Sequence, residues 1–576
     1  MSVLRVALAQ CNPVLGDIPG NGSTVLRWSR KAVEAGADLV AFPELMLTGC
    51  PVQDLGLRSA FTSASLAGLS RLAGDLEAEG LGDTPVVVGY LDPADPADPA
   101  LSAGEPGSVP CSAAAVLHRG EVAARYLKAP GSDLPAVRIR GVDVVLLVGD
   151  DLHGNAEPLA TAGAGLVLHL SAAPYQVGSR PARKAALARL AAAAGAPVAS
   201  VNMVGGQDDV VFAGGSMVVD PGGQCLAAAG LFTDDLLVAE LTLSAAGAGG
   251  GPLRRLPRST TVPDAPAPVP EAAPLLELPD IWRALVVGTR DYARKNGFAT
   301  TVVALSGGID SALVAVIAAD ALGAANVAGI SMPGDYSSEH SKADAAELAR
   351  RVGLDFRTVP IQPIVDAMPD VLRLDGIAAE NIQARARGMI LMAVSNQEDR
   401  LPLNTGNKTE YSCGHNTLYG DQVGGYAPLK DVPKTLVWAL ARWRNDQARR
   451  RGEPEPIPDR TITKEPSPEL QPGQVDSELL PAPYEVLDEI LAGYVEADLS
   501  RDELVARGAS PAVVDQLIEM VERGEFKRRQ APPGPRVSRR AFGPDRRMPI
   551  TNQFVPHGHR ATYFPHAEPA TGAGAP

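Results

Sequence analysis

The sequence predicts an α/β protein built from two successive domains, and three observations support this prediction. In both halves, short apolar runs alternate with amphipathic stretches long enough to form helices. Residues 301–305 are apolar or β-branched throughout and pass through Gly307-Gly308 directly into the apolar stretch 312–322. Between the halves, residues 245–274 contain a glycine run and several prolines, a composition that cannot bury a core.

The overall composition narrows the class of protein. With 576 residues, 45% hydrophobic and 21% charged, the chain can bury the cores of several globular domains. Its net charge of −15, without a lysine- or arginine-rich block, argues against a nucleic-acid partner. The five cysteines lack C-x-x-C spacing, which favours a reducing compartment over disulfides or zinc. We recognise no signal peptide or membrane span and expect a cytoplasmic protein.

The first half, residues 1–245, is predicted to form one α/β domain. Its predicted strands are residues 5–10, 39–42, 86–88, 114–118, 144–148, 165–170, 198–202 and 216–219. Amphipathic helices are expected between several of them, notably at residues 21–35 and 180–194.

Three motifs of this half indicate its chemistry. Glu44 lies in Phe42-Pro43-Glu44-Leu45, Lys128 closes Tyr126-Leu127-Lys128, and Asp150-Asp151 follows an apolar strand. These motifs resemble the carbon–nitrogen hydrolase (nitrilase) superfamily, in the form of the glutaminase half of glutamine-dependent NAD synthetases. The resemblance implies a nitrilase-like αββα sandwich. It also implies a glutamate base, an oxyanion-stabilising lysine and a cysteine that attacks the glutamine amide to release ammonia.

One position departs from this pattern. By the resemblance, Glu44 matches the base and Lys128 the lysine, but Gly149 stands at the nucleophile position and cannot form an acyl-enzyme. His153 stands where the family has a tryptophan, and we expect it at the surface or in packing. We therefore predict a glutaminase-like domain that has lost hydrolysis, with Glu44 and Lys128 remaining as a buried ion pair.

Cys50, six residues beyond Glu44, is the alternative thiol. If it replaced the missing nucleophile, the chain would be a fully glutamine-dependent synthetase or a nitrilase-class amidase. A glutamine-like electrophile such as diazo-oxonorleucine would then label Cys50. An incidental small buried residue is the simpler interpretation, because free cysteines commonly pack as small hydrophobic groups.

The second domain is predicted at residues 276–550, after a Pro/Gly-rich linker at 246–275 and before a flexible tail at 551–576. Repeated βα units predict a parallel sheet that binds ligands at the carboxyl ends of its strands. The predicted strands are residues 300–305, 327–332, 356–361 and 401–404, with crossover helices at 311–322 and 339–352.

The loop Ser306-Gly307-Gly308-Ile309-Asp310-Ser311 joins the first of these strands to its helix. A glycine turn before a helix N-terminus offers free N–H groups to an anion. The loop lacks the spacing and the lysine of a Walker A motif. It resembles the pyrophosphate-binding loop of ligases that cleave ATP between the α- and β-phosphates, which implies Mg²⁺ on Asp310. A serine-capped turn with glycines needed only for packing is the rival interpretation.

Companion segments narrow the choice among such ligases, which include GMP, asparagine and argininosuccinate synthetases. The chain from about residue 280 to 550 is similar, nearly end to end, to the ammonia-ligating domain of NAD synthetases. The resemblance implies a Rossmann-like parallel α/β nucleotide-binding domain in which the nicotinate carboxylate of deamido-NAD attacks ATP. Ammonia then attacks the acyl-adenylate, releasing AMP and NAD⁺. The matching segments are residues 380–388, 404–410, 417–421, 431–435, 465–470 and 525–530.

The resemblance also implies the residues of the site. The groups expected to bind ATP are Ser306, Gly307, Gly308, Ile309, Asp310, Ser311 and Thr405. Those expected to bind deamido-NAD are Asn381, Arg385, Glu410, His415, Asn416, Thr417, Leu418 and Lys527. Asp310 and Glu410 would hold Mg²⁺, with cationic help from Lys430, Lys434 or Arg385. A solvated helix face for Arg385 and Arg387, and a substituted stacking role for His415, are the simpler interpretations.

The leading hypothesis is therefore an ATP-dependent NAD synthetase that uses ammonia, free or from a partner, in place of glutamine. An amidase active in the first half and a non-catalytic nucleotide sensor are the alternatives. Gly149 argues against the first, and the intact loop 306–311 argues against the second. Family members pair through the synthetase domain, so we expect a homo-oligomer, at least a dimer.

Overall fold

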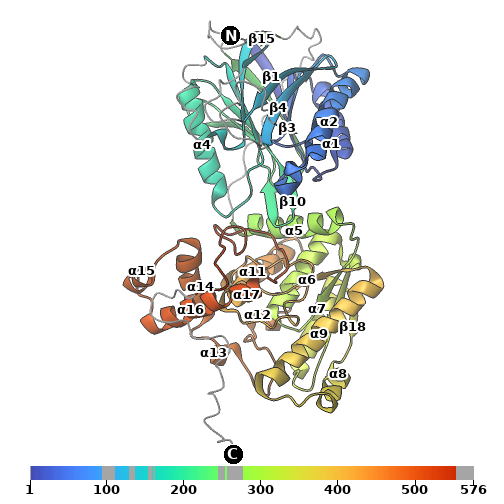
Figure 1. Ribbon diagram of the computed structural model, residues 1–576, viewed down its shortest axis with the longest axis vertical. Helices are drawn as coiled ribbons and strands as arrows, with labels where there is room; N and C mark the ends of the chain where they lie inside the picture. The colour runs from blue at the N-terminus through green and yellow to red at the C-terminus, as the bar shows by residue number, and fades with distance from the viewer. Residues whose placement is uncertain are drawn as a thin grey trace, which may run out of the picture. The chain divides into compact units, whose positions relative to one another are not determined.

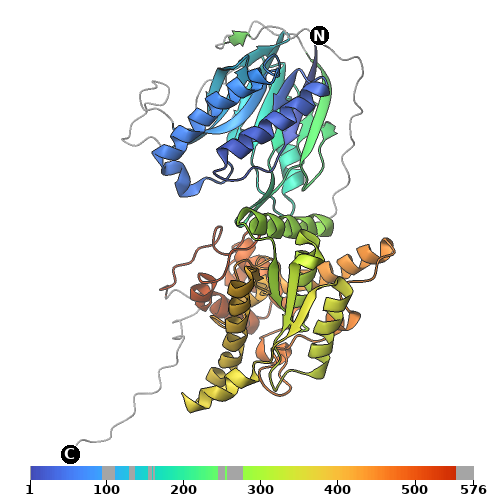
Figure 2. The same ribbon diagram turned by 90° about the vertical axis from the view of Figure 1, so that its right-hand side faces the viewer.

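The computed structural model describes residues 2–93, 110–128, 136–152, 159, 163–243, 253–255 and 277–552. The chain divides into two compact units, Met1–Val287 and Gly288–Pro576 (Figures 1 and 2). The predicted linker and tail fall almost entirely outside the described residues, so the domain boundaries stay predictions. Among the described residues, no helix has the length and apolar character that crossing a membrane requires.

The first unit contains two large sheets and one small hairpin. The first sheet has the order β14-β1-β2-β3-β4-β5, and the second has the order β13-β12-β9-β8-β7-β6-β15. The strands of the first sheet are β1 (Ser2–Gln10), β2 (Leu39–Ala41), β3 (Val86–Asp92), β4 (Cys111–His118), β5 (Glu121–Leu127) and β14 (Asp235–Leu243). Those of the second are β6 (Ala136–Ile139), β7 (Val142–Val148), β8 (Leu166–Ser171), β9 (Val198–Asn202), β12 (Met217–Val219), β13 (Cys225–Ala228) and β15 (Leu253–Arg255). The hairpin joins β10 (Val204–Gln207) to β11 (Val210–Ala213).

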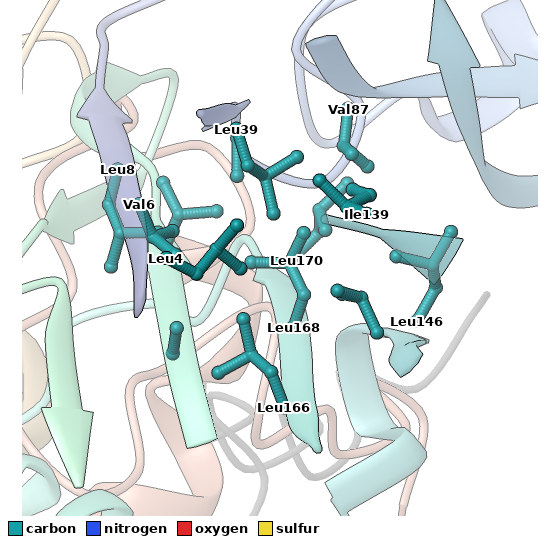
Figure 3. Packing of buried hydrophobic residues seen from close by; sticks show 14 of the residues in the cluster. Leu4, Val6, Leu8, Leu39, Val87, Ile139, Leu146, Leu166, Leu168 and Leu170 are labelled. Atoms are coloured by element: carbon teal, nitrogen blue, oxygen red, sulfur yellow. The ribbon is translucent and has the colours of Figure 1, made fainter. Parts of the chain in front are cut away.

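The two large sheets pack face to face through one apolar core. Alternate residues of β1, such as Leu4 and Leu8, meet alternate residues of β8, such as Leu166 and Leu170 (Figure 3). The outer face of the first sheet packs against α1 (Ile18–Glu34) and α2 (Ser59–Ala78), and that of the second against α4 (Ser179–Ala194) (Figure 1). These four layers confirm the predicted αββα sandwich.

The second unit is organised around a parallel sheet with the order β18-β17-β16-β19. Its strands are β16 (Thr301–Ala304), β17 (Val327–Ser331), β18 (Asp355–Thr358) and β19 (Leu401–Leu403). The chain runs outward from β16 to β18 and then returns to pair β19 with the other side of β16. The strand order therefore reverses between β16 and β19, and the loops that leave these two strands lie together at the carboxyl edge.

Helices surround this sheet and form a second apolar cluster beyond it. The larger helices are α6 (Ile309–Leu322), α7 (Glu339–Val352), α9 (Gly376–Glu398), α11 (Lys434–Arg450) and α16 (Pro511–Arg523). The helix α5 (Glu277–Lys295) spans the division between the units, and its residues from Gly288 onward belong to this one. The shorter ones are α8 (Gln362–Ala367), α10 (Lys408–Cys413), α12 (Asp459–Thr463), α13 (Asp476–Leu479), α14 (Tyr484–Leu491), α15 (Arg501–Ala506) and α17 (Glu525–Arg528). Leu487, Leu504 and Val514 hold α14, α15 and α16 in the second cluster. The predicted α/β class with a parallel nucleotide-binding-type sheet is confirmed.

Candidate active sites

Gly149 directly follows β7 and has a positive φ of 59°. A side chain added here would point at two predicted residues. Its Cβ would stand 2.6 Å from Glu44 Oε1 and 2.8 Å from Lys128 Nζ. The fold therefore brings Glu44, Lys128 and Gly149 together from three separate stretches of chain, with no thiol at the position between them.

Glu44 is held in a largely buried position after β2. It is 9% exposed, and its Oε2 accepts a hydrogen bond of 3.3 Å from the N–H of Ala172. Burial raises the pKa of Glu44, and the neighbouring Lys128 charge partly offsets this effect.

Lys128 pairs with a different carboxylate from the one predicted. Its Nζ lies 3.5 Å from Oδ2 of the exposed Asp150. No ion pair within 4.0 Å joins Lys128 to Glu44, both of which the structure describes. The predicted buried pair was therefore wrong, and the physical reason is that an ion pair with an exposed partner avoids the desolvation that a fully buried pair requires.

His169, which sequence reasoning missed, holds the backbone of Gly149. Its Nε2 lies 2.8 Å from the Gly149 carbonyl oxygen, and its Nδ1 lies 2.9 Å from Ser200 Oγ. Burial lowers the pKa of His169 to about 4, so the ring is neutral near pH 7. Because a carbonyl oxygen only accepts, Nε2 carries the proton and Nδ1 accepts from Ser200. The available signal was a histidine inside an otherwise apolar predicted strand.

The environment of Cys50 does not favour a replacement nucleophile. Cys50 is half-buried and packs against an apolar cluster that includes Met203 and Phe212. Burial, reinforced by the charge of Glu44, raises the pKa of the Cys50 thiol to about 12. The thiol is therefore protonated near neutral pH, and the thiolate is the reactive form. The predicted position of His153 lies outside the described residues.

A cavity of about 360 Å³ opens beside Glu44 and Gly149. Residues 171–175 and 213–215 form part of its wall, and Arg180 and Arg183 of α4 line it as well. Arg183 donates hydrogen bonds to the carbonyl oxygens of residues 214 and 215, at 3.0 and 2.5 Å. These two hydrogen bonds fix one part of the cavity wall. No cysteine is among the described residues that line the cavity.

Two serines within the loop after β16 stabilise it through hydrogen bonds. Ser311 Oγ accepts from the N–H of Ser306 at 3.3 Å and donates to the Gly308 carbonyl oxygen at 3.0 Å. Gly307 has a φ of 83°, and a Cβ there would lie 2.3 Å from the carbonyl oxygen of Ser341. Glycine is therefore required at 307 for both its backbone angle and its lack of a side chain. The loop delivers the chain to Ile309, where α6 begins.

Asp310, Glu410 and Lys434 converge at the carboxyl edge of the sheet. Lys434 Nζ lies 2.5 Å from Asp310 Oδ2 and 3.5 Å from Glu410 Oε1. Asn407, which was not predicted, caps α10 by accepting from the Glu410 N–H at 3.0 Å. It also donates its Nδ2 to Asp310 Oδ1 at 2.9 Å. The backbone N–H of Asn407 also donates to Glu410 Oε2 at 3.2 Å, so this one residue contacts both carboxylates that were predicted as metal ligands.

The charged groups of this cluster change one another's pKa values. Burial lowers the pKa of Lys434, but the charges of Asp310 and Glu410 outweigh it, and the pKa is raised overall. Burial and the Asp310 charge raise the pKa of Glu410 to about 8, despite the opposing effect of Lys434. Glu410 is therefore largely protonated near pH 7 when no cation is bound, and a cation placed beside Asp310 and Glu410 would favour the ionised form of Glu410.

Two residues of α9 that were predicted to bind substrate hold the loop at 414–421. Asn381 Oδ1 accepts from Thr417 Oγ1 at 2.8 Å. Arg385 Nε donates to the carbonyl oxygen of Leu418 at 3.2 Å. Arg385 is an exposed side chain of α9, and this hydrogen bond joins it to the predicted substrate loop.

Lys527 of α17 holds the same loop from another side. Its Nζ donates to the carbonyl oxygens of Gly414 and Asn416, at 2.8 and 2.7 Å. Between them, the His415 N–H donates to the Glu410 carbonyl oxygen at 3.0 Å, and burial lowers the pKa of the His415 ring. A largely neutral imidazole fits a packing or stacking role better than a cationic one.

The remaining predicted residues are spread more widely. Thr405 lies between β19 and α10. Lys430 Nζ donates to the carbonyl oxygen of Pro532 at 2.6 Å. Of the two lysines predicted near the anions, Lys434 is thus the one that contacts Asp310.

A further polar group, also missed as a site, supports the loop at 306–311. Glu469 accepts from Ser338 Oγ at 2.8 Å and from Ser341 Oγ at 2.7 Å, and lies 3.4 Å from Lys464 Nζ. Because the Ser341 carbonyl abuts Gly307, this group ties residues 464–469 to the loop. The only sequence signal was the family segment at 465–470.

Comparisons with known proteins match both halves. The family model described as carbon-nitrogen hydrolase matches residues 5–249, and the one described as NAD synthase matches residues 281–531. The glutamine-dependent NAD(+) synthetase of Thermotoga maritima is 40% identical, covering 96% of this chain and 99% of the relative. The same enzyme of Xylella fastidiosa is 39% identical with equal coverage.

Solved structures agree with these matches. The glutamine-dependent NAD+ synthetase of Acinetobacter baumannii, in complex with ADP, aligns with a TM-score of 0.70 and 35% identity. The alignment covers 96% of this chain and 99% of that one. The synthetase of Cytophaga hutchinsonii aligns with a TM-score of 0.76 over 95% and 98% of the two chains, and at 18% identity it supports the fold alone.

Proposed function

The chain belongs to the glutamine-dependent NAD(+) synthetases and is a ligase that forms a C–N bond, and from this premise we propose that it converts deamido-NAD to NAD⁺ with ATP and ammonia. The choice of ammonia depends on one observation. Gly149 occupies the position between Glu44 and Lys128 at which the family's nucleophile is expected. Because glycine has no thiol, position 149 cannot supply the group that would form an acyl-enzyme with glutamine.

The groups around Asp310 suit the proposed chemistry of the second half. The nicotinate carboxylate attacks the α-phosphate of ATP, and pyrophosphate leaves. The N–H groups at the start of α6 and the loop at 306–311 would bind the phosphates. Lys434 offsets the repulsion between the two anions, and Lys527 and Arg385 hold the loop expected to contact deamido-NAD. Ammonia then attacks the acyl carbon of the adenylate, and AMP leaves.

The carboxylates of Asp310 and Glu410 fit a magnesium ion. Their oxygens already converge on one cationic group, Lys434 Nζ, and their side chains are 17% and 22% exposed, so phosphate and water could complete a coordination shell. Within the described ranges, no cluster of three or more His, Cys, Asp or Glu side chains could hold a metal. Mg²⁺ held here by Asp310 and Glu410 would neutralise charge on the departing pyrophosphate.

A comparison of nitrogen donors tests the proposal. The purified full-length chain is given deamido-NAD, ATP and Mg²⁺ with either ammonium chloride or glutamine, and NAD⁺ is measured. We expect NAD⁺ with ammonium and little or none with glutamine. Equal rates with the two donors would overturn the assignment of ammonia, whereas no NAD⁺ with either donor would overturn the synthetase reaction itself.

We also propose that two copies pair through the synthetase unit. The α9 region exposes apolar side chains: Val371 is 80% exposed, Ile377 74% and Met389 56%. Burying such side chains against a second copy would remove apolar surface from water. Sedimentation analysis should show a dimer, and Met389→Asp should shift it toward monomer. A wild-type chain that sediments as a monomer at micromolar concentration would contradict the pairing.

A further inference from the structure

The helix α14 packs beside α11 (Figure 1) and also contacts α10, and these two neighbours carry Lys434 and Glu410. We propose that Asp488 of α14 and Thr409 of α10 are positioning residues, which hold Lys434 beside Asp310 and Glu410 for the phosphate chemistry. This inference deepens the proposed function and rests on it, because the rate that the two residues control is the rate of that reaction.

A closed ring of hydrogen bonds joins the first turns of α10 and α11. The backbone N–H of Lys434 donates to Thr409 Oγ1 at 2.9 Å, and this hydroxyl donates in turn to Asp488 Oδ1 at 2.5 Å. The other carboxylate oxygen, Oδ2, accepts from the Thr435 N–H at 2.8 Å and from Thr435 Oγ1 at 2.7 Å. Thr409 is 1% exposed and Asp488 is 9% exposed, so little water competes for these bonds.

Asp488 supplies a cap that α11 does not carry itself. The helix follows Pro433, which makes no side-chain capping bond, and the N–H groups of a first helical turn have no partner within the helix. A carboxylate that accepts from one of them is also stabilised by the positive end of the helix dipole. Because Glu410 directly follows Thr409, and Lys434 directly precedes Thr435, the ring fixes the separation of the two backbones that carry the charged groups.

The same helix contacts the ammonium group of Lys434. Tyr484 lies four residues before Asp488, so the two side chains share one face of α14. The centre of the Tyr484 ring is 5.3 Å from Lys434 Nζ, a distance that allows cation–π attraction. Leu487 anchors α14 in the apolar cluster that it forms with α15 and α16. One anchored helix therefore restrains both the backbone beside Lys434 and its charged end.

Steady-state NAD⁺ formation by the full-length chain, with ammonium, ATP, deamido-NAD and Mg²⁺, tests the proposal. Thr409→Val keeps the shape of the side chain but removes the hydroxyl. It should lower kcat about thirtyfold, while the KM values for ATP and deamido-NAD stay within about threefold of wild type. Thr409→Ser retains the hydroxyl and should keep kcat within about threefold. Asp488→Asn leaves one accepting oxygen where the ring uses two, and it should lower kcat to a similar extent as Thr409→Val.

A cycle of double substitutions separates positioning from a loss of stability. In a Lys434→Met background, adding Thr409→Val should lower kcat by less than about threefold, because the group that the ring positions is already absent.

Asn445→Leu is the matched structural control. Asn445 is buried on the same helix and exchanges two hydrogen bonds with the backbone of Ile457, at 2.8 and 3.1 Å. It lies about 16 Å along α11 from Lys434. This substitution should lower the melting temperature but leave kcat within about twofold of wild type.

Three results would overturn the positioning role. These are a kcat within about threefold of wild type in Thr409→Val, an equal loss in Thr409→Ser, or an undiminished effect of Thr409→Val in the Lys434→Met background. If circular dichroism shows that Asp488→Asn does not fold, the Thr409 variants decide the outcome. A wild-type chain that forms no NAD⁺ rejects the proposed function and this inference with it, whereas an active wild type with unchanged variants rejects the inference alone.

Discussion

The sites around Gly149 and around Asp310 both join a carboxylate and a lysine from distant parts of the chain, but they differ in completeness. At the second site, Asp310, Glu410 and Lys434 contact one another through ion pairs of 2.5 and 3.5 Å. At the first, Glu44 and Lys128 flank an empty position. The arrangement of a site can therefore persist after its reactive group is lost. The backbone and the buried neighbouring residues fix the arrangement, whereas a single side chain supplies the reactive atom.

The ion pairs of the two sites also differ in how far they are buried. Lys434 is 1% exposed and shared between two carboxylates, so the pair is part of a buried network. Lys128 instead reaches an exposed aspartate. Removing one member of a buried network leaves an uncompensated charge, whereas an exposed pair contributes little. Substitutions at the second site should therefore have the larger effects.

The largest expected effect is at Asp310. Asp310→Asn should lower the ammonium-supported kcat about a thousandfold, because it removes a charge that the proposed phosphate chemistry uses. Steady-state NAD⁺ formation measures this. Asp320→Asn is the matched control, since Asp320 lies on the same helix and pairs with Arg444. It should retain activity within about twofold. A rate above a tenth of wild type in Asp310→Asn would remove Asp310 from the catalytic groups.

Placing a thiol at position 149 should give the first site the reactive group that it lacks. Gly149→Cys should raise glutamate release from glutamine about a hundredfold over Gly149→Ser, because a thiol then stands beside a base and an oxyanion donor. The gain stays below that of an evolved site, since the positive φ strains a side chain and Glu44 must move aside. Adding Glu44→Gln should abolish the gain. No gain in the single variant would mean that more than the thiol has been lost.

His169 makes the stability of the first unit depend on pH. Its pKa is lowered from 6.5 to about 4 by burial, so the unfolded chain binds more protons between these values. Stability is therefore fully present above pH 6.5 and is lost as the pH falls toward 4, by about 2 kcal/mol at pH 5. His169→Asn should remove this dependence. Hydrogen exchange of β8 at pH 7 and pH 5 measures it, and an unchanged difference in the variant would contradict the assignment.

The smallest expected effect is at the substrate loop. Lys527→Met removes two hydrogen bonds to the carbonyl oxygens of Gly414 and Asn416. The KM for deamido-NAD should rise about tenfold with kcat within about twofold of wild type. Lys342→Met is the control, since Lys342 pairs with the exposed Glu339. Its KM should not change. A fall in kcat alone in Lys527→Met would point to a role in the chemical step.

The sequence predicted most of the strands and, among the helices, α1, α4, α6 and α7. Apolar or β-branched runs indicated β7 and β16, and a run interrupted by His169 indicated β8. Gly307 indicated the turn after β16, and Gly149 indicated that no thiol stands at the nucleophile position. It missed β5, β6, β13, β14, the hairpin of β10 and β11, and β15, which lies within the predicted linker. β14 pairs with β1 over the full register from Ser2 opposite Leu243 to Gln10 opposite Asp235. No local signal announces a pairing between segments so far apart in the chain.

The sequence by itself determined what kinds of atoms are available: a glycine without a thiol at 149, and a glycine loop followed by an aspartate at 310. Only the tertiary structure decided which groups meet. Asn407 bridges to Asp310 across 97 positions, and His169 reaches the carbonyl of Gly149 from a neighbouring strand. The physical reason is that composition and local pattern are properties of the chain, whereas hydrogen-bond partners and pairings between distant charges depend on how sheets and helices pack.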